Sequence, residues 1–342
     1  MPVARSQTCP VANHITWSSI ELLHNVVRTL NYLAALAPAE GGQPLPTVTY
    51  KGKVKLHGTN TAVQVTRDGV FYQSRTQMLE PGDDYKGFAQ WASQFRSYWT
   101  SLPEMVVFGE WCGPGVEPGM AISAVGEKQF AVFGLQIGTG AEARIVYEPA
   151  EIEKLLAGTR PKNMHVLPWQ NICVVIDFAN QTSLETAAAL INDIVVHVEK
   201  EDPWVKATFS VSGLGEGIVF YPVGENIPTD PEGLAKLMFK AKGEKHRTTR
   251  TKDAAQLAPE VVSGVEGFVA LVVTEARLQQ AVTTACGGVV DVKLTGKFLG
   301  WVTTDVEKES QAELAAAGLT WGQVKGAVQT AAREWFKAQS VR

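Results

Sequence analysis

Residues 55–60 read KLHGTN and combine the residue types that a nucleotide site needs. A lysine amine such as that of Lys55 attacks phosphorus only after it loses its proton. Because the free pKa of lysine is about 10.4, neutralising it at pH 7 costs roughly 4 to 5 kcal/mol, which desolvation and neighbouring cations or a metal must supply. Gly58 lets backbone approach a ligand, while Thr59 and Asn60 offer short polar groups to a sugar or base. The string therefore predicts a recessed, electropositive site.

The spacing of the lysines does not by itself select the nucleophile. Lys51 and Lys53 alternate with Lys55 and therefore share a strand face with it. The pattern lysine-x-histidine-glycine is also short, and a surface lysine beside a turn satisfies it equally well. Residues 48–75 alternate in hydrophobicity around an Asp-Gly pair at 68–69, which predicts two antiparallel strands joined by a hairpin turn.

Four other positions could serve the same chemistry. Glu110 has the carboxylate to accept a ribose hydroxyl or to hold a hydrated metal ion. Lys240 and Lys242 alternate on one strand, so both could contact a triphosphate, assist the departure of pyrophosphate and lower the pKa of a nearby lysine. Arg75 has a guanidinium that can bind a phosphate. Taken singly, Glu110 and Arg75 are also consistent with ordinary surface residues.

The composition indicates a globular protein with two domains. The chain has 342 residues, of which 45% are hydrophobic and 19% charged, which is enough for two separate cores. A net charge of −4 gives no overall electrostatic case for nucleic acid binding. Seven Lys or Arg residues against one acid do lie between positions 236 and 252, although a solvated linker has the same composition.

Several classes of protein are disfavoured. The amino terminus lacks a charged segment followed by a long apolar run, and no stretch is long and apolar enough to span a membrane, so we expect an intracellular, cytoplasmic protein without a membrane partner. Four cysteines without C-x-x-C spacing argue against a zinc knuckle and a disulfide framework. The six histidines show no metal-ligand spacing, and no Ser-His-Asp set stands out.

The first 250 residues are predicted to be α+β with mainly antiparallel sheets. Helical spacing is expected over 17–36, capped by Ser18 or Ser19, and over 183–200, where Thr182 and Glu185 form a capping box. The apolar stripe of the second helix is Leu184, Ala187, Ile191, Val195 and Val198. Further strand-like runs lie at 105–109, 130–137, 144–147, 166–169, 172–176 and 217–221.

The carboxyl end is predicted to be all-helical, with a domain boundary near residue 250. A long helical run opens at Pro259 and continues to Ala276. Two capping boxes follow, one at 310–313 and one at 320–323. The buried stripe expected of the last helix is Val324, Val328, Ala331 and Trp335.

Five strings, taken in order, resemble the motifs of the covalent nucleotidyltransferases, the class of RNA and DNA ligases and capping enzymes. They are KLHG at 55–58, FGEW at 108–111, FAVF at 130–133, EGIV at 216–219 and KAKG at 240–243. FGEW, followed by GPG at 113–115, is similar to the phage RNA ligase 2 family. The similarity continues into the carboxyl region, where that branch carries a helical domain and DNA ligases carry a small β-barrel. The EGFV at 266–269 repeats the fourth motif but falls within a helical pattern, which predicts helix core.

The resemblance implies a role for each position. Lys55 is the nucleophile, Glu216 and Glu110 are directed at the metal through water, and Phe133 stacks on adenine. Gly134 stands where the family tends to have Asp. The implied nucleotide-binding set is Lys55, His57, Gly58, Asn60, Arg75, Glu110, Phe133, Glu216, Lys240 and Lys242, and its catalytic members are Lys55, Glu110, Glu216, Lys240 and Lys242.

The fold and function implied by the resemblance are those of an RNA ligase. We expect an α+β nucleotidyltransferase (ATP-grasp-like ligase) domain over 1–250 and an all-α domain for RNA engagement over 251–342. ATP would supply AMP with the help of Mg²⁺ or Mn²⁺, and a monomer would join 3′-hydroxyl and 5′-phosphate ends of nicked RNA or hybrids. The alternatives are a DNA ligase or capping guanylyltransferase with the same core, and a non-catalytic protein that binds RNA ends.

Overall fold

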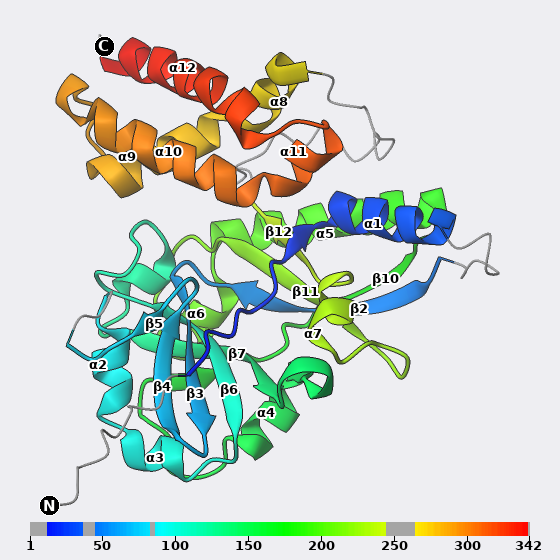
Figure 1. Ribbon diagram of the computed structural model, residues 1–342, viewed down its shortest axis with the longest axis vertical. Helices are drawn as coiled ribbons and strands as arrows, with labels where there is room; N and C mark the ends of the chain where they lie inside the picture. The colour runs from blue at the N-terminus through cyan, green and yellow to red at the C-terminus, as the bar shows by residue number, and fades with distance from the viewer. Residues whose placement is uncertain (1–11, 37–44, 83–85, 244–263, 341–342) are drawn as a thin grey trace, which may run out of the picture.

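Two β-sheets face each other, helices cover their outer faces, and a separate group of helices follows at the carboxyl end (Figure 1). The computed structural model describes residues 12–36, 45–82, 86–243 and 264–340. The predicted domain boundary near residue 250 and the predicted start of a helix at Pro259 lie outside these residues, as do the basic residues Lys245, Arg247, Arg250 and Lys252.

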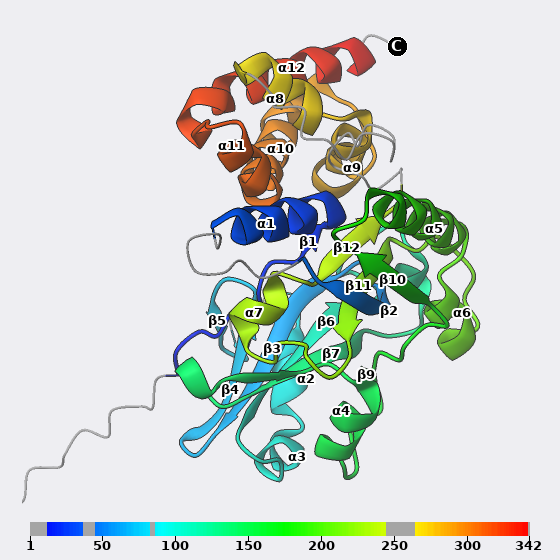
Figure 2. The same cartoon turned by 90° about the vertical axis from the view of Figure 1, so that its right-hand side faces the viewer.

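The first sheet has the strand order β1-β12-β11-β2-β10. Its strands are β1 (Glu21–Leu22), β12 (Phe239–Lys242), β11 (Gly217–Val223), β2 (Thr47–Lys55) and β10 (Cys173–Asp177). Apolar residues alternate along the strands, so one face packs Tyr50, Val54, Ile218, Phe220 and Phe239 against α1 (Leu23–Leu36) and α5 (Gln181–Lys200). The opposite face of β2 and β12 carries the lysines, and it is turned toward the second sheet (Figure 2).

The second sheet has the strand order β5-β4-β3-β6-β7-β8, and β9 pairs with β7 in parallel. Its strands are β5 (Met78–Leu79), β4 (Gly69–Ser74), β3 (Thr59–Thr66), β6 (Met105–Cys112), β7 (Gln129–Ile137), β8 (Arg144–Val146) and β9 (Met164–Val166). Val63 and Val65 point to one face and join the core under the short helices α2 (Phe88–Ser93), α3 (Arg96–Thr100) and α4 (Pro149–Leu155). The prediction of mainly antiparallel sheets is confirmed.

Residues from both sheets form the core between them. Phe108 of β6 and Ala62 of β3 meet Val219 and Tyr221 of β11, and Trp17 packs among them. The predicted strand pair over 48–75 is therefore only partly correct. The Asp-Gly hairpin joins β3 to β4, but the earlier strand β2 belongs to the other sheet, and residues 56–58 carry the chain across from one sheet to the other.

The helix predicted from Trp17 begins only at Leu23. Residues Glu21 and Leu22 instead form β1, which pairs in parallel with Phe239 and Lys240 of β12. Trp17 is 7% exposed and packs in the core between the sheets, so Ser18 and Ser19 cap no helix. The apolar residues at 17–22 are spaced by their burial between the sheets, and this spacing resembles that of a helix.

The helix α5 has the predicted buried stripe, with all five of its residues in the core. Its cap is different, because the Asn180 side chain accepts a hydrogen bond from the Ser183 backbone N–H in place of the expected Thr182 box. The remaining short helices of this part are α6 (Pro203–Phe209), α7 (Pro231–Ala235) and the 3₁₀ turns Ala121–Ala124 and Gly140–Glu142.

The carboxyl region is all-helical over the described residues, as predicted. It consists of α8 (Gly264–Val272), α9 (Glu275–Cys286), the 3₁₀ turn Val292–Leu294, α10 (Thr295–Glu309), α11 (Gln311–Ala316) and α12 (Trp321–Ser340). EGFV lies in α8, as expected, but the long helix predicted to reach Ala276 is wrong, because Thr274 caps a new helix there. Phe268, Phe298 and Phe336 are at the centre of this separate core.

Two details of the last helices differ from the predictions. In α12 the fully buried positions after Val328 are Ala332 and Phe336, one residue beyond the expected Ala331 and Trp335. The 320–323 box forms in part, because Gln323 accepts a hydrogen bond from the Thr320 backbone N–H at 2.7 Å. Ser310 precedes α11 without a side-chain cap bond.

Two findings concern the helices and the cysteines of the described residues. No helix among them is long and apolar enough to cross a lipid bilayer. Cys112, Cys173 and Cys286 are free thiols, while Cys9 lies outside the described residues.

Candidate active site

Strand register brings distant motifs into one row at the end of the first sheet. Gly217 of β11 pairs with Lys55 of β2 on one side and with Lys242 of β12 on the other. Paired residues of neighbouring strands point to the same face, so both lysine side chains project toward the second sheet. A Cβ on Gly217 would overlap the backbone of Ala241, so a glycine is required between the two lysine-bearing strands.

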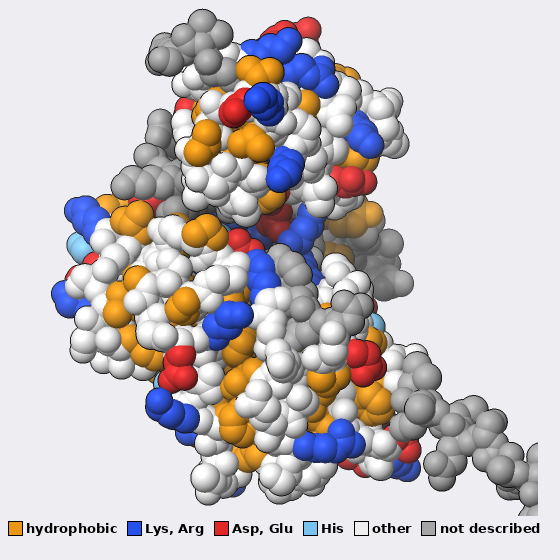
Figure 3. Space-filling model, turned by 90° about the vertical axis from the view of Figure 1, so that its left-hand side faces the viewer, with side chains coloured by type: hydrophobic (Ala, Val, Ile, Leu, Met, Phe, Trp, Pro, Cys, Tyr) orange, Lys and Arg blue, Asp and Glu red, His pale blue; other side chains and the backbone are white. Residues whose placement is uncertain are grey.

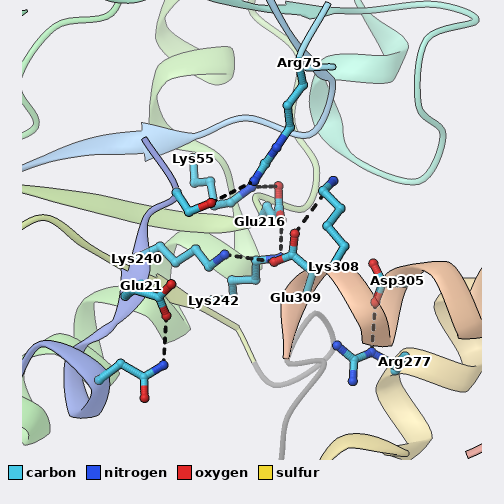
Figure 4. Close-up of polar contacts among 12 residues, drawn as sticks. Glu21, Lys55, Arg75, Glu216, Lys240, Lys242, Arg277, Asp305, Lys308 and Glu309 are labelled. Atoms are coloured by element: carbon cyan, nitrogen blue, oxygen red, sulfur yellow. Dashed lines mark hydrogen bonds and ion pairs between the residues drawn. The ribbon is translucent and has the colours of Figure 1, made fainter. Parts of the chain in front are cut away.

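Glu216, one residue before this row, is the centre of an ion cluster. One carboxylate oxygen lies 2.7 Å from Lys55 Nζ and 3.6 Å from His57 Nδ1, and the other lies 3.1 Å from Lys242 Nζ. Figure 4 shows Glu216 between these lysines, and its side chain is only 5% exposed. Although burial alone would raise the pKa of Glu216, Lys55 and Lys242 hold it well below its usual range. The carboxylate is therefore permanently charged at neutral pH, and it raises the pKa of Lys242 against the effect of burial.

The crossing between the sheets brings the lysine string against the end of β6. A Cβ on Gly58 would lie 2.8 Å from Cys112 Cβ and closer still to the Trp111 carbonyl oxygen, so only glycine fits there. Two residues later, Asn60 pairs with Glu110 across the β3–β6 ladder. The chain segment that holds His57, Gly58 and Asn60 thus connects Lys55 of the first sheet to the strand pair that includes Glu110.

Glu110 belongs to the same electrostatic site as Glu216. The pKa of Glu110 is raised to about 7, chiefly by burial. Lys55, His57 and Arg75 lower it, and the charge of Glu216 adds to the rise. The charge of Glu110 is disfavoured by burial and by Glu216, and a divalent cation between the two carboxylates would relieve it. No group of three or more metal-ligating side chains occurs among the described residues. The pair therefore fits an ion that keeps most of its ligands as water and phosphate, as Mg²⁺ prefers.

Phe133 occupies a bulge in β7, which explains how it leaves the regular strand pattern. Phe108 pairs with Gly134 and Gly109 pairs with Val132, so Phe133 is the extra residue between them. Its ring meets Trp17 edge-on at 5.0 Å between centroids. A Cβ at Gly134 would lie 2.5 Å from the Trp17 ring, so the absence of the family's Asp is matched by an indole in its place. Trp17 supports Phe133, a role that the sequence did not reveal.

Lys53 was open as a nucleophile in the sequence, and its setting differs from that of Lys55. It is 1% exposed, its Nζ donates to the Phe133 carbonyl oxygen at 3.0 Å, and it lies 4.9 Å from the centroid of the Trp169 ring. Burial lowers the pKa of Lys53 to about 7. This lysine is fixed beneath the site by the very residue expected to stack on adenine, and Lys55 is the lysine at the edge of the site.

Arg75 and Lys240 flank the cluster from two sides. Arg75 follows β4 and reaches toward the cluster, with an Nη2 atom 3.3 Å from Ser19 Oγ (Figure 4). Lys240 points from β12 to the carboxyl helices, where its Nζ lies 2.9 Å from a Glu309 carboxylate oxygen. The structure thus brings Lys55, His57, Glu216 and Lys242 into direct contact, places Glu110 and Arg75 within their electrostatic reach, and gives Lys240 a different partner.

A model of the RNA ligase family matches residues 49–242, which are more than half of the chain and contain four of the five motif strings and all but the last residue of the fifth. The chain belongs to the RNA ligase family. No curated protein matches it.

Solved structures of Naegleria gruberi RNA ligase are similar at low identity. A lysine-to-alanine mutant with ATP and Mn has 15% identity over 67% of this chain and 56% of its own, with a TM-score of 0.42. A second such mutant with ATP and Mn has 15% identity over 72% and 63%, with a TM-score of 0.43. The same ligase with PPi has 14% identity over 71% and 61%, with a TM-score of 0.41. The chain therefore covers less than two thirds of each of these relatives.

Proposed function

We propose that this protein is an ATP-dependent RNA ligase and that Lys55 is its nucleophile. Lys55 Nζ would form a bond to the α-phosphorus of ATP while the bond to the pyrophosphate oxygen breaks, leaving a lysyl-AMP. The AMP would then pass to an RNA 5′-phosphate, and a 3′-hydroxyl would displace it to form the phosphodiester. The observation that carries the proposal is that strand pairing through Gly217 places Lys55 and Lys242 on one face of the sheet, where Lys55 contacts the Glu216 carboxylate. The chain that holds them belongs to the RNA ligase family.

The contacts around Lys55 support this assignment over the other lysines of β2. Lys53 is buried and its amine donates to a carbonyl. Lys51 lies in the middle of the strand, with its Nζ 5.8 Å from the Trp169 ring centroid. The amine of Lys55 instead contacts the Glu216 carboxylate, which also contacts Lys242 of β12. Release from Glu216 when an anionic nucleotide arrives would free its amine for attack.

The remaining residues would position and stabilise charge. Lys242 and Lys240 would contact the triphosphate and stabilise the leaving pyrophosphate, because phosphoryl transfer depends on charge stabilisation and alignment. Arg75 would hold a phosphate of AMP or RNA. Phe133 would stack on adenine, and the Glu110 carboxylate would accept a ribose hydroxyl. Glu110 and Glu216 would hold Mg²⁺ or Mn²⁺ through water, and this ion would neutralise phosphate charge when bound.

The two parts of the chain would divide the work. Residues 1–250 would form an ATP-grasp-like adenylyltransferase domain, in the manner of the RNA ligase 2 branch. Residues 251–342 would engage the backbone of a nicked RNA duplex or hybrid through its A-form shape and hydroxyl groups. Sealing should therefore weaken as salt increases, and one chain suffices for the reaction.

The intact mass of the protein mixed with ATP and Mg²⁺ tests the proposal. Wild type and Lys51→Ala should gain one AMP, and Lys55→Ala should gain none. Lys51→Ala is the matched control because it removes a lysine from the same face of the same strand. Adding a nicked RNA duplex with a 5′-phosphate should then discharge the AMP and join the strands.

Three results would replace the proposal with another function. An adduct formed with GTP and not with ATP would indicate a capping guanylyltransferase. Joining of nicked DNA without joining of RNA would indicate a DNA ligase. Absence of an adduct in wild type, together with retained binding of RNA ends, would indicate a non-catalytic protein.

A further inference from the structure

The carboxyl helices contribute a carboxylate to the edge of the site. Glu309 is the last residue of α10, and its Oε2 lies 2.9 Å from Lys240 Nζ on β12. Both side chains are shielded, with 16% and 20% exposure. In Figure 3 acidic and basic side chains gather at the constriction between the helical region and the sheets. The contact therefore joins the two parts of the molecule at the cation proposed to meet the triphosphate.

The helix that carries Glu309 is held in place independently of Lys240. Four residues earlier on the same face, Asp305 lies 2.9 Å from Nε of Arg277, a fully buried side chain of α9. On the next helix Glu313 lies 4.0 Å from His24 of α1, which Figure 2 shows directly beneath the helical region. Glu309 is thus positioned by its own domain and needs no contribution from Lys240 to stay there.

The position of Glu309 is unfavourable for its own helix. An acid in the last turn faces the negative end of the helix dipole. Lys308 gives only a distant and half-exposed pair at 3.8 Å. The compensation comes from across the domain boundary, because Lys240 and Lys242 hold the pKa of Glu309 far below its usual range against the effect of burial. Its charge is matched to the lysine pair of β12.

We propose that the Glu309 carboxylate is an internal stand-in for the triphosphate of ATP, which occupies Lys240 in the nucleotide-free protein and competes with ATP and with pyrophosphate for that cation. The inference rests on the proposed function, since it takes Lys240 and Lys242 as the triphosphate contacts. Glu216 neutralises Lys55 and Lys242 from within the sheet, and Glu309 neutralises Lys240 from outside it. ATP must displace Glu309, and departure of pyrophosphate lets it return.

This arrangement has a consequence for the direction of the reaction. Once pyrophosphate leaves, the carboxylate refills the site and opposes rebinding, so the reverse reaction from lysyl-AMP to ATP is suppressed. The same competition raises the ATP concentration needed for adenylation. Glu309 therefore affects the reaction only through its competition for Lys240, and it does not contact the reacting atoms.

Binding of tripolyphosphate to the full chain tests the inference without requiring any reaction. In calorimetry with EDTA present, Glu309→Gln should bind tripolyphosphate on the order of fivefold to tenfold more tightly than wild type, the size expected for the loss of one shielded competing ion pair. Glu307→Gln is the matched control, because it removes the same charge from an exposed position two residues earlier on α10. Lys240→Met should abolish the gain when combined with Glu309→Gln.

The outcomes separate this inference from the proposed function. Equal or weaker binding by Glu309→Gln overturns the inference, even if wild type forms lysyl-AMP normally. Tighter binding with no AMP adduct in wild type upholds the competition and rejects the ligase chemistry. If Glu309→Gln does not fold, Glu309→Asp, which keeps the charge and shortens its reach, must still bind tripolyphosphate more tightly than wild type, and equal affinity refutes the inference.

Discussion

Replacing Glu216 by Gln should destabilise the protein strongly, because it leaves buried cations without their shared counter-ion. The carboxylate meets Lys55 at 2.7 Å and Lys242 at 3.1 Å, and its side chain is 5% exposed. At an effective dielectric constant of about 20, each contact represents roughly 5 to 6 kcal/mol of gross attraction, most of which desolvation offsets. Removing one member of such a group costs about 3 kcal/mol net, because the remaining charges stay buried and repel each other.

Urea denaturation at neutral pH would measure this loss, with Glu225→Gln as the matched control. Glu225 follows the same strand, β11, in an exposed loop. The control should lie within about 0.5 kcal/mol of wild type. In a thermal scan the Glu216 variant should unfold about 6 to 12 °C lower, on the scale of about 2 to 4 °C per kcal/mol for a part of this size.

The pH dependence of the unfolding free energy tests the same prediction independently. Because the folded pKa of Glu216 lies well below the ordinary value of 4.5, its stabilisation is present above that value and is lost as pH falls through the folded pKa. The gap between wild type and Glu216→Gln should be constant from neutral pH to moderately acidic pH and should narrow in stronger acid. A variant as stable as wild type at pH 7, or a gap that does not narrow in acid, would refute the reasoning.

Two further substitutions test the close approach and the buried lysine. Gly58→Ala would press a methyl group against the Trp111 carbonyl and against Cys112 Cβ at 2.8 Å, so it should cost about 1 to 3 kcal/mol in urea denaturation and raise the ATP concentration for half-maximal adenylation. For Lys53, whose pKa is lowered to about 7 by burial, the cost of the buried ammonium is present below pH 7 and vanishes as pH rises toward 10.5. The unfolding free energy of Lys53→Met relative to wild type should therefore fall between pH 7 and pH 10, by at most about 1.4 kcal/mol per pH unit, and a constant difference would contradict the assigned burial.

Local sequence patterns predict a helix or strand correctly where one of its faces packs against a single core. The stripe of α5 from Leu184 to Val198 was predictable because its buried residues recur at helical spacing against the first sheet alone. The cap was misplaced by two residues because Asn180 and Thr182 are both good caps, and the local sequence does not rank them. In the same way, the stripe of α12 was shifted to Ala331 when the core lies at Ala332.

The errors concentrate where distant strands decide the local structure. Trp17 to Leu22 has helical spacing, yet β12 pairs with Glu21 and Leu22 from more than two hundred residues later, and Trp17 fills the space above Gly134. Similarly, β2 and β3 both alternate, and no local signal shows that they enter different sheets at Gly58. Pairing partners are a property of the whole chain, which periodicity does not contain.

Some residues of the candidate site could also be predicted from the sequence, and others could not. Lys55, Glu216 and Lys242 were predictable as a set because the order of their motifs resembles that of a family, and the register of the first sheet brings them together. Their particular roles remain predictions until the adenylation experiments are made. Glu309 and Lys53 belong to no motif. A lysine flanked by buried residues on a predicted strand was the only available signal for Lys53, and Glu309 had none, since its partner lies 69 residues earlier.

The first sheet also determines when this protein can become active during its synthesis. Its central pairing joins Lys55 to a strand that starts next to Glu216, 161 residues later in the chain. Closing so long a loop is slow compared with local folding, so this sheet should form late. A ribosome-bound chain that has emerged only as far as β10 would expose one side of β2 as an unpaired strand edge, which favours aggregation and chaperone binding until β11 and β12 arrive.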